Sequence, residues 1–205
     1  MTTWVEPEGG RERGLLGLAK AFTQVVVNPR TFFREAVSPG DQAPGLAFGI
    51  AVVLVEESIR LALAPDAALA LPASTPIRIT LTVALAALLV APAALHALSA
   101  IQTLALAALA PDRGGVSETV QVLAYASAPC VAAGVHVPAV RVVVGLWGFC
   151  LLVAGTRIVH DTTYPRALLA AAIPGALAFG YGFRWFGATV RVFPWLADVL
   201  PWVHV

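Results

Sequence analysis

Five long apolar stretches dominate the sequence, and each is near the length that crosses a lipid bilayer. The hydrocarbon core of a bilayer needs about 20 residues of helix. Hydrophobic residues make up 59% of the 205 residues and charged residues only 12%, far from the balance of a soluble protein. We therefore expect an all-α, polytopic membrane helical bundle with five transmembrane helices. The predicted spans are residues 44–64, 77–109, 117–136, 140–159 and 167–186.

A soluble all-helical protein is the alternative, because long Ala and Leu helices can also build a large core. Charged residues lie mostly at the ends of the five stretches, which favours the membrane interpretation. The second stretch is longer than a bilayer requires and contains Pro92. We expect it to tilt, kink or project beyond the membrane.

Two amphipathic helices are predicted ahead of the first span, in an N-terminal segment of residues 1–43. In residues 11–27 apolar side chains recur at helical spacing, but the stretch is too short and too polar to cross a membrane. Residues 28–37 begin with an N-cap Asn and a Pro that suits the first helical position. Such helices lie in the headgroup region. We expect Phe32 and Phe33, on one side of the second helix, to contact lipid or a partner.

The membrane domain is predicted to cover residues 44–186 and a short interfacial tail residues 187–205, which are rich in Trp, Val and Pro. Five spans place the two termini on opposite sides of the membrane. Most basic residues fall on the N-terminal side, and the loop 65–76 on the other side has no Lys or Arg. The positive-inside rule therefore predicts a cytoplasmic N terminus. One Lys among 13 basic residues suggests a GC-rich, prokaryotic source.

The first predicted span contains three charged residues, Glu56, Glu57 and Arg60. An ionisable side chain inside a membrane costs about 2.5–3.5 kcal/mol on insertion scales, so each needs a partner or a purpose. Glu56 and Arg60 are four residues apart, in the order that favours a helical ion pair. We expect a structural pair here more than an ion or proton relay, and Glu57 is the residue that favours a relay.

Polar side chains also interrupt the second and third predicted spans. The second contains a polar run of His96, Ser99, Gln102 and Thr103, and the third contains Gln121, Tyr125 and Ser127. A rise of about 1.5 Å per residue places His96 and Ser99 at a depth similar to that of Tyr125 if the helices are antiparallel. We expect these residues to join helices by hydrogen bonds. Proton transfer by His96 is the alternative.

Catalytic and cofactor-binding motifs are not found in the sequence. It contains no GxSxG, no HExxH and no P-loop. Cys130 and Cys150 lie in apolar runs without the spacing of a metal site. A net charge of +1 and the lack of a binding motif argue against nucleic acid as a partner. We expect a non-enzymatic protein with no cofactor, whose main partner is the lipid bilayer.

A set of ordered landmarks resembles the Yip1-domain family of five-span membrane proteins. The most specific piece is "YASAP", residues 125–129, which is similar to the family's Tyr-Ala-x-x-Pro in the third span. The resemblance implies five spans and a cytoplasmic N terminus. Eukaryotic relatives contact Rab-type GTPases, but GTPase binding is not carried over because the N-terminal segment is short and the source is expected to be prokaryotic. The other landmarks are "NPRTFF" at 28–33, His96, Val137–Pro138 and Trp147.

Pro129 removes one backbone hydrogen bond and should bend the third span. A bend inside a membrane is tolerated where neighbouring helices satisfy the freed groups. We expect Gln121, Tyr125 and Ser127 to tie the bent helix to the second span, which makes this stretch a packing hub.

Two functions from different classes remain open. The first is a non-enzymatic bundle that organises the membrane or binds other membrane proteins. The second is a small transporter or channel subunit that uses Glu57, Arg60, His96 and Tyr125 along an internal path. Discontinuous helices would favour transport.

Overall fold

The computed structural model describes residues 14–110 and 113–199. Within these two ranges all regular secondary structure is helical, as the sequence predicts. The predicted helical residues 11–13 and the tail beyond residue 199 lie outside the described residues. The α-helices are α1 (Leu15–Val27), α2 (Pro29–Glu35), α3 (Ala43–Leu63), α4 (Thr75–Leu85), α5 (Ala91–Leu109), α6 (Val116–Ala126), α7 (Pro138–Val159), α8 (Tyr164–Gly175) and α9 (Trp185–Val192).

Shorter helical segments of two other types connect or interrupt these α-helices. Two are π-helical, a type that often marks functional positions; one lies inside the helix Thr75–Leu109 and the other forms the end of the helix Tyr164–Gly182. They are η2 (Ala86–Val90) and η4 (Ala176–Gly182), while the 3-10 segments are η1 (Pro65–Ala67), η3 (Ala128–Gly134) and η5 (Pro194–Asp198).

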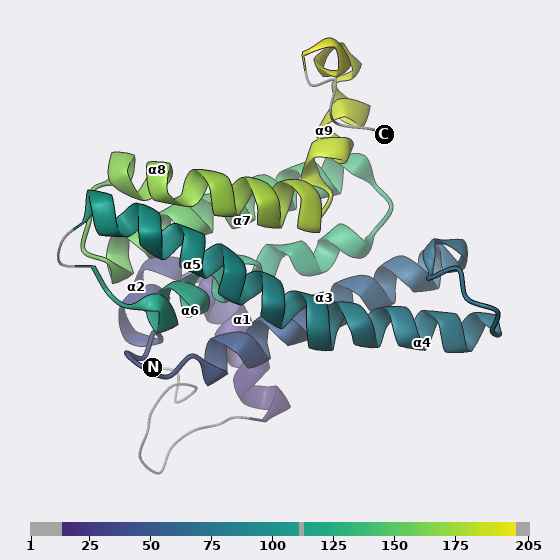
Figure 1. Cartoon of the computed structure of the whole chain (residues 1–205), viewed down its shortest axis with the longest axis horizontal. Helices are drawn as coiled ribbons and strands as arrows, with labels where there is room; N and C mark the ends of the chain where they lie inside the picture. The colour runs from purple at the N-terminus through teal and green to yellow at the C-terminus, as the bar shows by residue number, and fades with distance from the viewer. Residues whose placement is uncertain (1–13, 111–112, 200–205) are drawn as a thin grey trace.

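Five segments run lengthwise through the molecule and alternate in direction (Figure 1). We call the end of the bundle with residues 113–115 and 160–163 the proximal end, and the end with loops 64–74 and 135–137 the distal end. The bounds of the five segments agree with the predicted spans to within a few residues. The segments are α3, α4 with η2 and α5, α6 with η3, α7, and α8 with η4.

By length and composition, two helices in the described part of the chain could cross a membrane, Thr75–Leu109 and Pro138–Val159. A third crossing results if Tyr164–Gly182 and Trp185–Val192, bent by 71°, count as one span. The helix α3 is long enough but carries three charged residues, and the third segment changes from α-helix to 3-10 helix. The described residues therefore form a helical bundle with two or three apolar helices that could cross a membrane.

The helix Thr75–Leu109 leaves many large apolar side chains uncovered. A continuous apolar face of this kind on the outside of a folded chain suits contact with lipid or another protein. The exposed residues on this helix include Ile77, Leu81, Leu85, Leu88, Leu89, Val90, Ile101 and Leu104.

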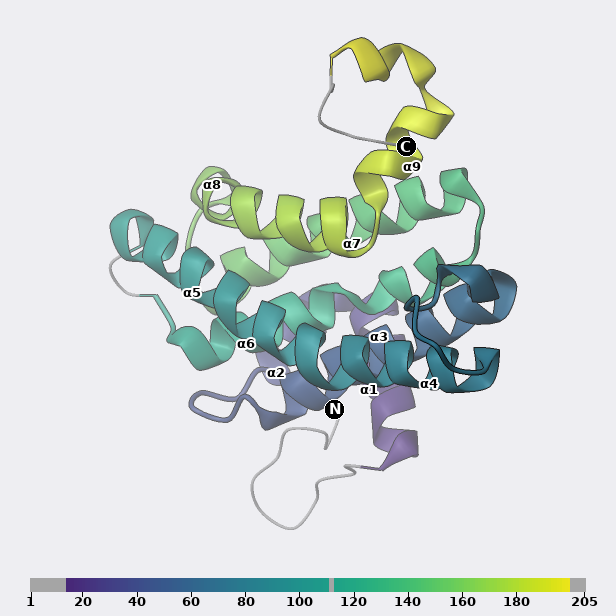
Figure 2. The ribbon, with the colours of Figure 1, turned by 45° about the vertical axis from the view of Figure 1, so that its right-hand side comes forward.

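The helices α1 and α2 pack beneath the lengthwise segments, on the opposite side from α9 (Figure 2). Phe32 and Phe33 are 2% and 1% exposed and belong to the main core. The expectation that these two residues contact lipid or a partner is therefore wrong. Because α2 packs against α7, the apolar side of α2 is used inside the molecule, and the Phe33 ring fills the space over Gly155.

The third segment breaks where the sequence predicts. The helix α6 ends at Ala126, and the 3-10 segment η3 follows, with Pro129 as its second residue. Proline has no N–H, so the α-helical hydrogen bonds do not continue through Pro129. The segment η3 packs against α3 so closely that a side chain at Gly134 would collide with the carbonyl oxygen of Glu56. The break thus places η3 against the charged part of α3.

Candidate functional site

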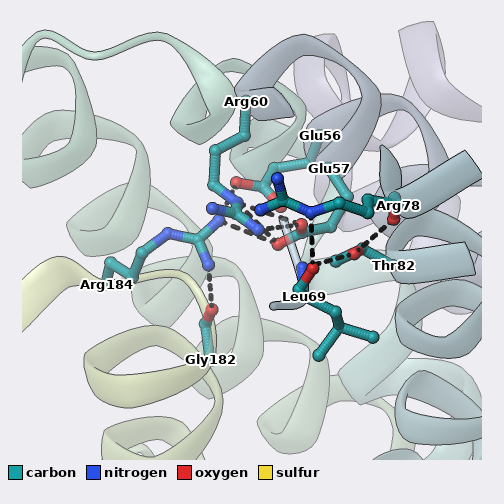
Figure 3. Close-up of polar contacts among 8 residues, drawn as sticks. All are labelled: Glu56, Glu57, Arg60, Leu69, Arg78, Thr82, Gly182 and Arg184. Atoms are coloured by element: carbon teal, nitrogen blue, oxygen red, sulfur yellow. Dashed lines mark hydrogen bonds and ion pairs between the residues drawn. The ribbon is translucent and has the colours of Figure 1, made fainter. Parts of the chain in front are cut away.

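Four charged side chains meet near the distal end of the bundle (Figure 3). Arg60 donates from Nε and Nη2 to Oε2 of Glu57, at 2.9 and 2.6 Å. Arg184 donates from Nη2 to Oε1 of Glu57 at 3.1 Å and also to Oε1 of Glu56. The two carboxylates and two guanidinium groups are balanced in charge, which offsets the cost of placing them among apolar helices.

Arg184 reaches this cluster from the sharp turn between η4 and α9. Its backbone is in the left-handed region, with φ of 62°, which is uncommon for a residue other than glycine. The turn is also where the chain bends by 71°. Strained residues of this kind persist where the surrounding structure holds them, and they are found often at functional sites.

An apolar cavity of about 320 Å³ adjoins the charged cluster. Glu56, Glu57 and Arg184 line its distal part. Gly49 lines another part, about two helical turns before Glu56 on α3. A Cβ added to Gly49 would lie 2.8 Å from the Leu95 side chain on α5. The cavity therefore has a charged end and a long apolar remainder.

Both π-helical segments contribute to the wall of this cavity. Ala86 and Val90 come from the ends of η2, and residues 177–179 and Gly182 come from η4. A π-helical turn shifts the register of the side chains that follow it, so a helix can open locally without ending. The size and the mainly apolar lining are those of a small-molecule site with a few orienting polar groups.

The structure brings together only part of the predicted path from Glu57 to Tyr125. Glu57 and Arg60 are in contact, but the predicted pair of Glu56 with Arg60 is wrong. Arg60 binds Glu57, three residues away, and Glu56 binds Arg184. His96 is exposed on α5, and its Nδ1 is 2.7 Å from the carbonyl oxygen of Pro92. The predicted contact of His96 with Tyr125 is therefore wrong.

Tyr125 and Gln121 are buried, but they join elements other than the second span. The ring of Tyr125 packs edge-on against Phe32 and Phe48, with centroids 4.9 and 5.2 Å apart. Gln121 donates from Nε2 to the carbonyl oxygen of Ser38 at 2.7 Å and accepts the Ser38 N–H at 3.0 Å. The packing hub therefore ties α6 to α2, α3 and the loop before α3.

Ser127 does not take part in the predicted tie. Its hydroxyl donates to the carbonyl oxygen of Ala124, 2.6 Å away on the same helix, so it caps α6 locally.

A second polar cluster lies at the proximal end. Gln102 on α5 donates to Oγ1 of Thr156 on α7 at 2.7 Å. Thr103 donates to Oγ1 of Thr119 on α6 at 3.1 Å, and Nε2 of His160 lies 3.4 Å from the same oxygen. These bonds join three helices, so the polar run of the second span acts as a structural link between helices.

His160 follows the last residue of α7 and is 1% exposed. Burial lowers the pKa of its imidazole to about 4, because the charged form loses its hydration. The nearby backbone of Gly114 acts in the opposite direction, and the positive charge of Arg113 lowers the pKa further. His160 is thus held neutral inside the proximal cluster.

Arg184 is the site residue that the sequence argument misses. In the sequence it lies at the end of the last apolar stretch, where an Arg is ordinary. The first predicted span contains two acids and one Arg, so one negative charge required a second cation from elsewhere in the chain, and this was the sequence signal that pointed to such a residue. Among the described residues no group of three or more His, Cys, Asp or Glu side chains is placed to hold a metal ion.

The long apolar helices, the exposed apolar face and the paired charges inside the bundle define a helical membrane protein. A family model described as Yip1 domain matches residues 23–190, so the chain belongs to the Yip1 domain family. That family is in general one of non-enzymatic membrane proteins. No curated protein and no solved structure matches the chain.

Proposed function

We propose that this Yip1-domain protein is a non-enzymatic, multi-pass membrane protein that organises its membrane by binding one lipid in the apolar cavity. In this proposal the five lengthwise segments all cross the bilayer, with the N terminus in the cytoplasm and the C terminus on the opposite side. The observation that supports this proposal is a cavity of about 320 Å³ that is apolar along most of its length and charged at one end.

The shape and the chemistry of the cavity fit an amphiphile. Lipids surround any helical bundle in a membrane. A lipid acyl chain forms no hydrogen bonds, so it suits cavity walls made of Leu, Val, Ala and Phe side chains. A polar headgroup requires polar partners, and the charged residues of the lining, Glu56, Glu57 and Arg184, stand at the distal end, while Ser127 is a further polar residue of the lining. A lipid bound in this way would lie with its headgroup toward the distal end.

Filling the cavity tests the proposal. Ala94 lines the cavity, whereas its neighbour Ala93 on the same helix is exposed. Ala94→Phe should abolish retention of lipid by the purified protein in native mass spectrometry, and Ala93→Phe should leave retention unchanged. Equal retention by wild type, Ala94→Phe and Ala93→Phe would show that the bound lipid lies elsewhere and would overturn the proposal.

Transport is the second candidate, because the last lengthwise segment is interrupted. The π-helical segment η4 and the 71° bend before α9 form a discontinuous helix beside the buried acids. Membrane transporters place binding sites at such breaks. Ion or proton flux into liposomes, lost in Glu57→Gln and retained in His96→Gln, would favour transport over a lipid-organising role.

A further inference from the structure

Near the distal end lies a second set of buried polar atoms, which take no part in the ion pairs of Glu56, Glu57, Arg60 and Arg184. These are Nη2 of Arg141, Nε of Arg184 and Nε1 of Trp185, each buried and each without a hydrogen-bond partner in residues 14–110 and 113–199. All three are N–H donors. Buried donors are normally satisfied, so three in one region indicate an acceptor beyond the described residues.

The three donors lie on two adjoining elements. Arg184 and Trp185 are consecutive at the start of α9, and Trp185 packs on α7 at Gly145, where a Cβ would come within 2.8 Å of the indole. Arg141 lies one helical turn before Gly145 and so faces the same region. Arg184 is close enough to Arg141 to act on its charge.

Arg141 is the anchor of this set. It is 7% exposed, and its Nε donates to the carbonyl oxygen of Ala133 at 2.7 Å. This bond holds the guanidinium group between η3 and α7, and within residues 14–110 and 113–199 Arg141 forms no ion pair. An Arg in this state is expensive inside a membrane protein unless it meets an anion.

The local charge also favours an anion. Glu56 and Glu57 are balanced by Arg60 and Arg184, which leaves the positive charges of Arg141 and Arg191 in excess. Four arginines against two glutamates give a local net charge of +2. Both Arg141 and Arg191 act on the nearby His136 as well, which places them in one positive region.

We propose that Arg141, Arg184 and Trp185 bind a phosphate group, whether it belongs to a phospholipid headgroup or to a soluble phosphate. Phosphate offers several acceptor oxygens to the forked donors of arginine. Because Arg184 also lines the cavity, a phosphate bound here would adjoin the place of a lipid headgroup. The phospholipid form of this inference rests on the proposed function, and the soluble form does not.

The test measures stabilisation of the purified, detergent-solubilised protein by four additives. They are dioleoylphosphatidylglycerol, dioleoylglycerol (which has the same tails and no phosphate), glycerol 3-phosphate and inorganic phosphate. Wild-type protein should bind phosphatidylglycerol about tenfold more tightly than Arg141→Gln and about threefold more tightly than Trp185→Phe. Arg166→Gln, an exposed arginine at the proximal end, should bind as wild type.

The outcomes separate this site from the cavity. Arg141-dependent binding of phosphatidylglycerol that Ala94→Phe also weakens supports the lipid headgroup as the source. Arg141-dependent binding of inorganic phosphate or glycerol 3-phosphate that Ala94→Phe leaves intact supports a phosphate site even though the proposed lipid function fails.

Equal binding of dioleoylglycerol and phosphatidylglycerol would overturn the phosphate site and leave the lipid cavity standing. Unchanged binding in folded Arg141→Gln would overturn it as well. If Arg141→Gln does not fold, Trp185→Phe decides the question, because it keeps an aromatic ring beside Gly145 and removes the indole N–H donor.

Discussion

Glu56 on α3 and Arg184 at the start of α9 form an ion pair across 128 positions of the chain. The same guanidinium group also reaches Glu57, so one side chain from the last lengthwise segment neutralises two acids of the first. This contact closes the distal part of the bundle between its first and last segments. Both side chains also line the cavity, so in the proposed function the same pair stabilises the bundle and adjoins the bound lipid.

Arg184→Gln should destabilise the protein by about 3 kcal/mol, because the change leaves two carboxylates with only Arg60 to neutralise them. Adding Glu56→Gln should recover part of this loss, since it removes the uncompensated charge. Unfolding of the two single variants and the double variant in detergent, followed by circular dichroism, measures the coupling energy. Additive losses would mean that the two side chains do not interact.

Gln121→Leu should destabilise the protein by about 2 kcal/mol. The change leaves the N–H and carbonyl oxygen of Ser38 without their partner. The loop before α3 should then be cut faster by protease, which provides a local readout. Gln121→Glu keeps one acceptor but turns negative charge toward the Ser38 carbonyl oxygen, so it should be no more stable than Gln121→Leu. Protease resistance equal to wild type in both variants would contradict this role.

The sequence predicted the five lengthwise segments to within a few residues because apolar length and proline breaks are local signals. It also predicted a bend of the third segment at Pro129, because the missing N–H is a property of the residue itself, and the α-helix gives way to the 3-10 segment η3 there. Partners across the bundle were predicted poorly. Periodicity states which side of a helix is apolar and does not state what covers that side, so Phe32 was assigned to lipid when α2 packs inside the molecule.

The candidate site was predicted only in its acidic half. Glu57 and Arg60 belong to one helix and their spacing is readable, whereas Arg184 joins them only through the fold. The order of pairing also depends on Arg184, because it draws Glu56 away from Arg60. Two π-helical segments contribute to the wall of the cavity, and the sequence carries no clear signal for them.

Gly134→Ala should destabilise the protein strongly, by about 2–3 kcal/mol, because the new Cβ would overlap the backbone of α3 at Glu56 and η3 would have to move. Gly187 on α9 is the matched control, since a Cβ there meets no atom within 4 Å. Gly187→Ala should be neutral or raise stability by up to about 1 kcal/mol, as expected for a helical glycine. Thermal unfolding of both variants checks the contrast, and similar behaviour would argue against close contact of η3 with α3.

Phe32→Ala should cost about 3–5 kcal/mol, because a fully buried ring that packs on Tyr125 is lost. Phe193→Ala removes an exposed ring and should change stability by no more than about 0.5 kcal/mol. Chemical unfolding of the two variants in the same detergent provides the comparison. A small loss at Phe32 together with weaker membrane association would restore the lipid-contact interpretation.

Acidification should weaken the proximal cluster through His160. The pKa of this histidine is about 4 in the folded protein against an ordinary value of 6.5, so the unfolded chain binds the proton more readily. The stabilising effect of the neutral imidazole is therefore complete above pH 6.5 and is lost as the pH falls toward 4. The loss amounts to about 3 kcal/mol at its limit.

The free energy of unfolding, measured between pH 7.5 and 4, checks the sign in wild type, His160→Gln and His96→Gln. His160→Gln should show a shallower fall below pH 6.5, because its side chain does not titrate. The exposed His96 is the matched control, and His96→Gln should keep the slope of the wild type. An identical slope in all three proteins would show that His160 does not couple folding to pH, and that the buried threonines beside it accept the charged ring without cost.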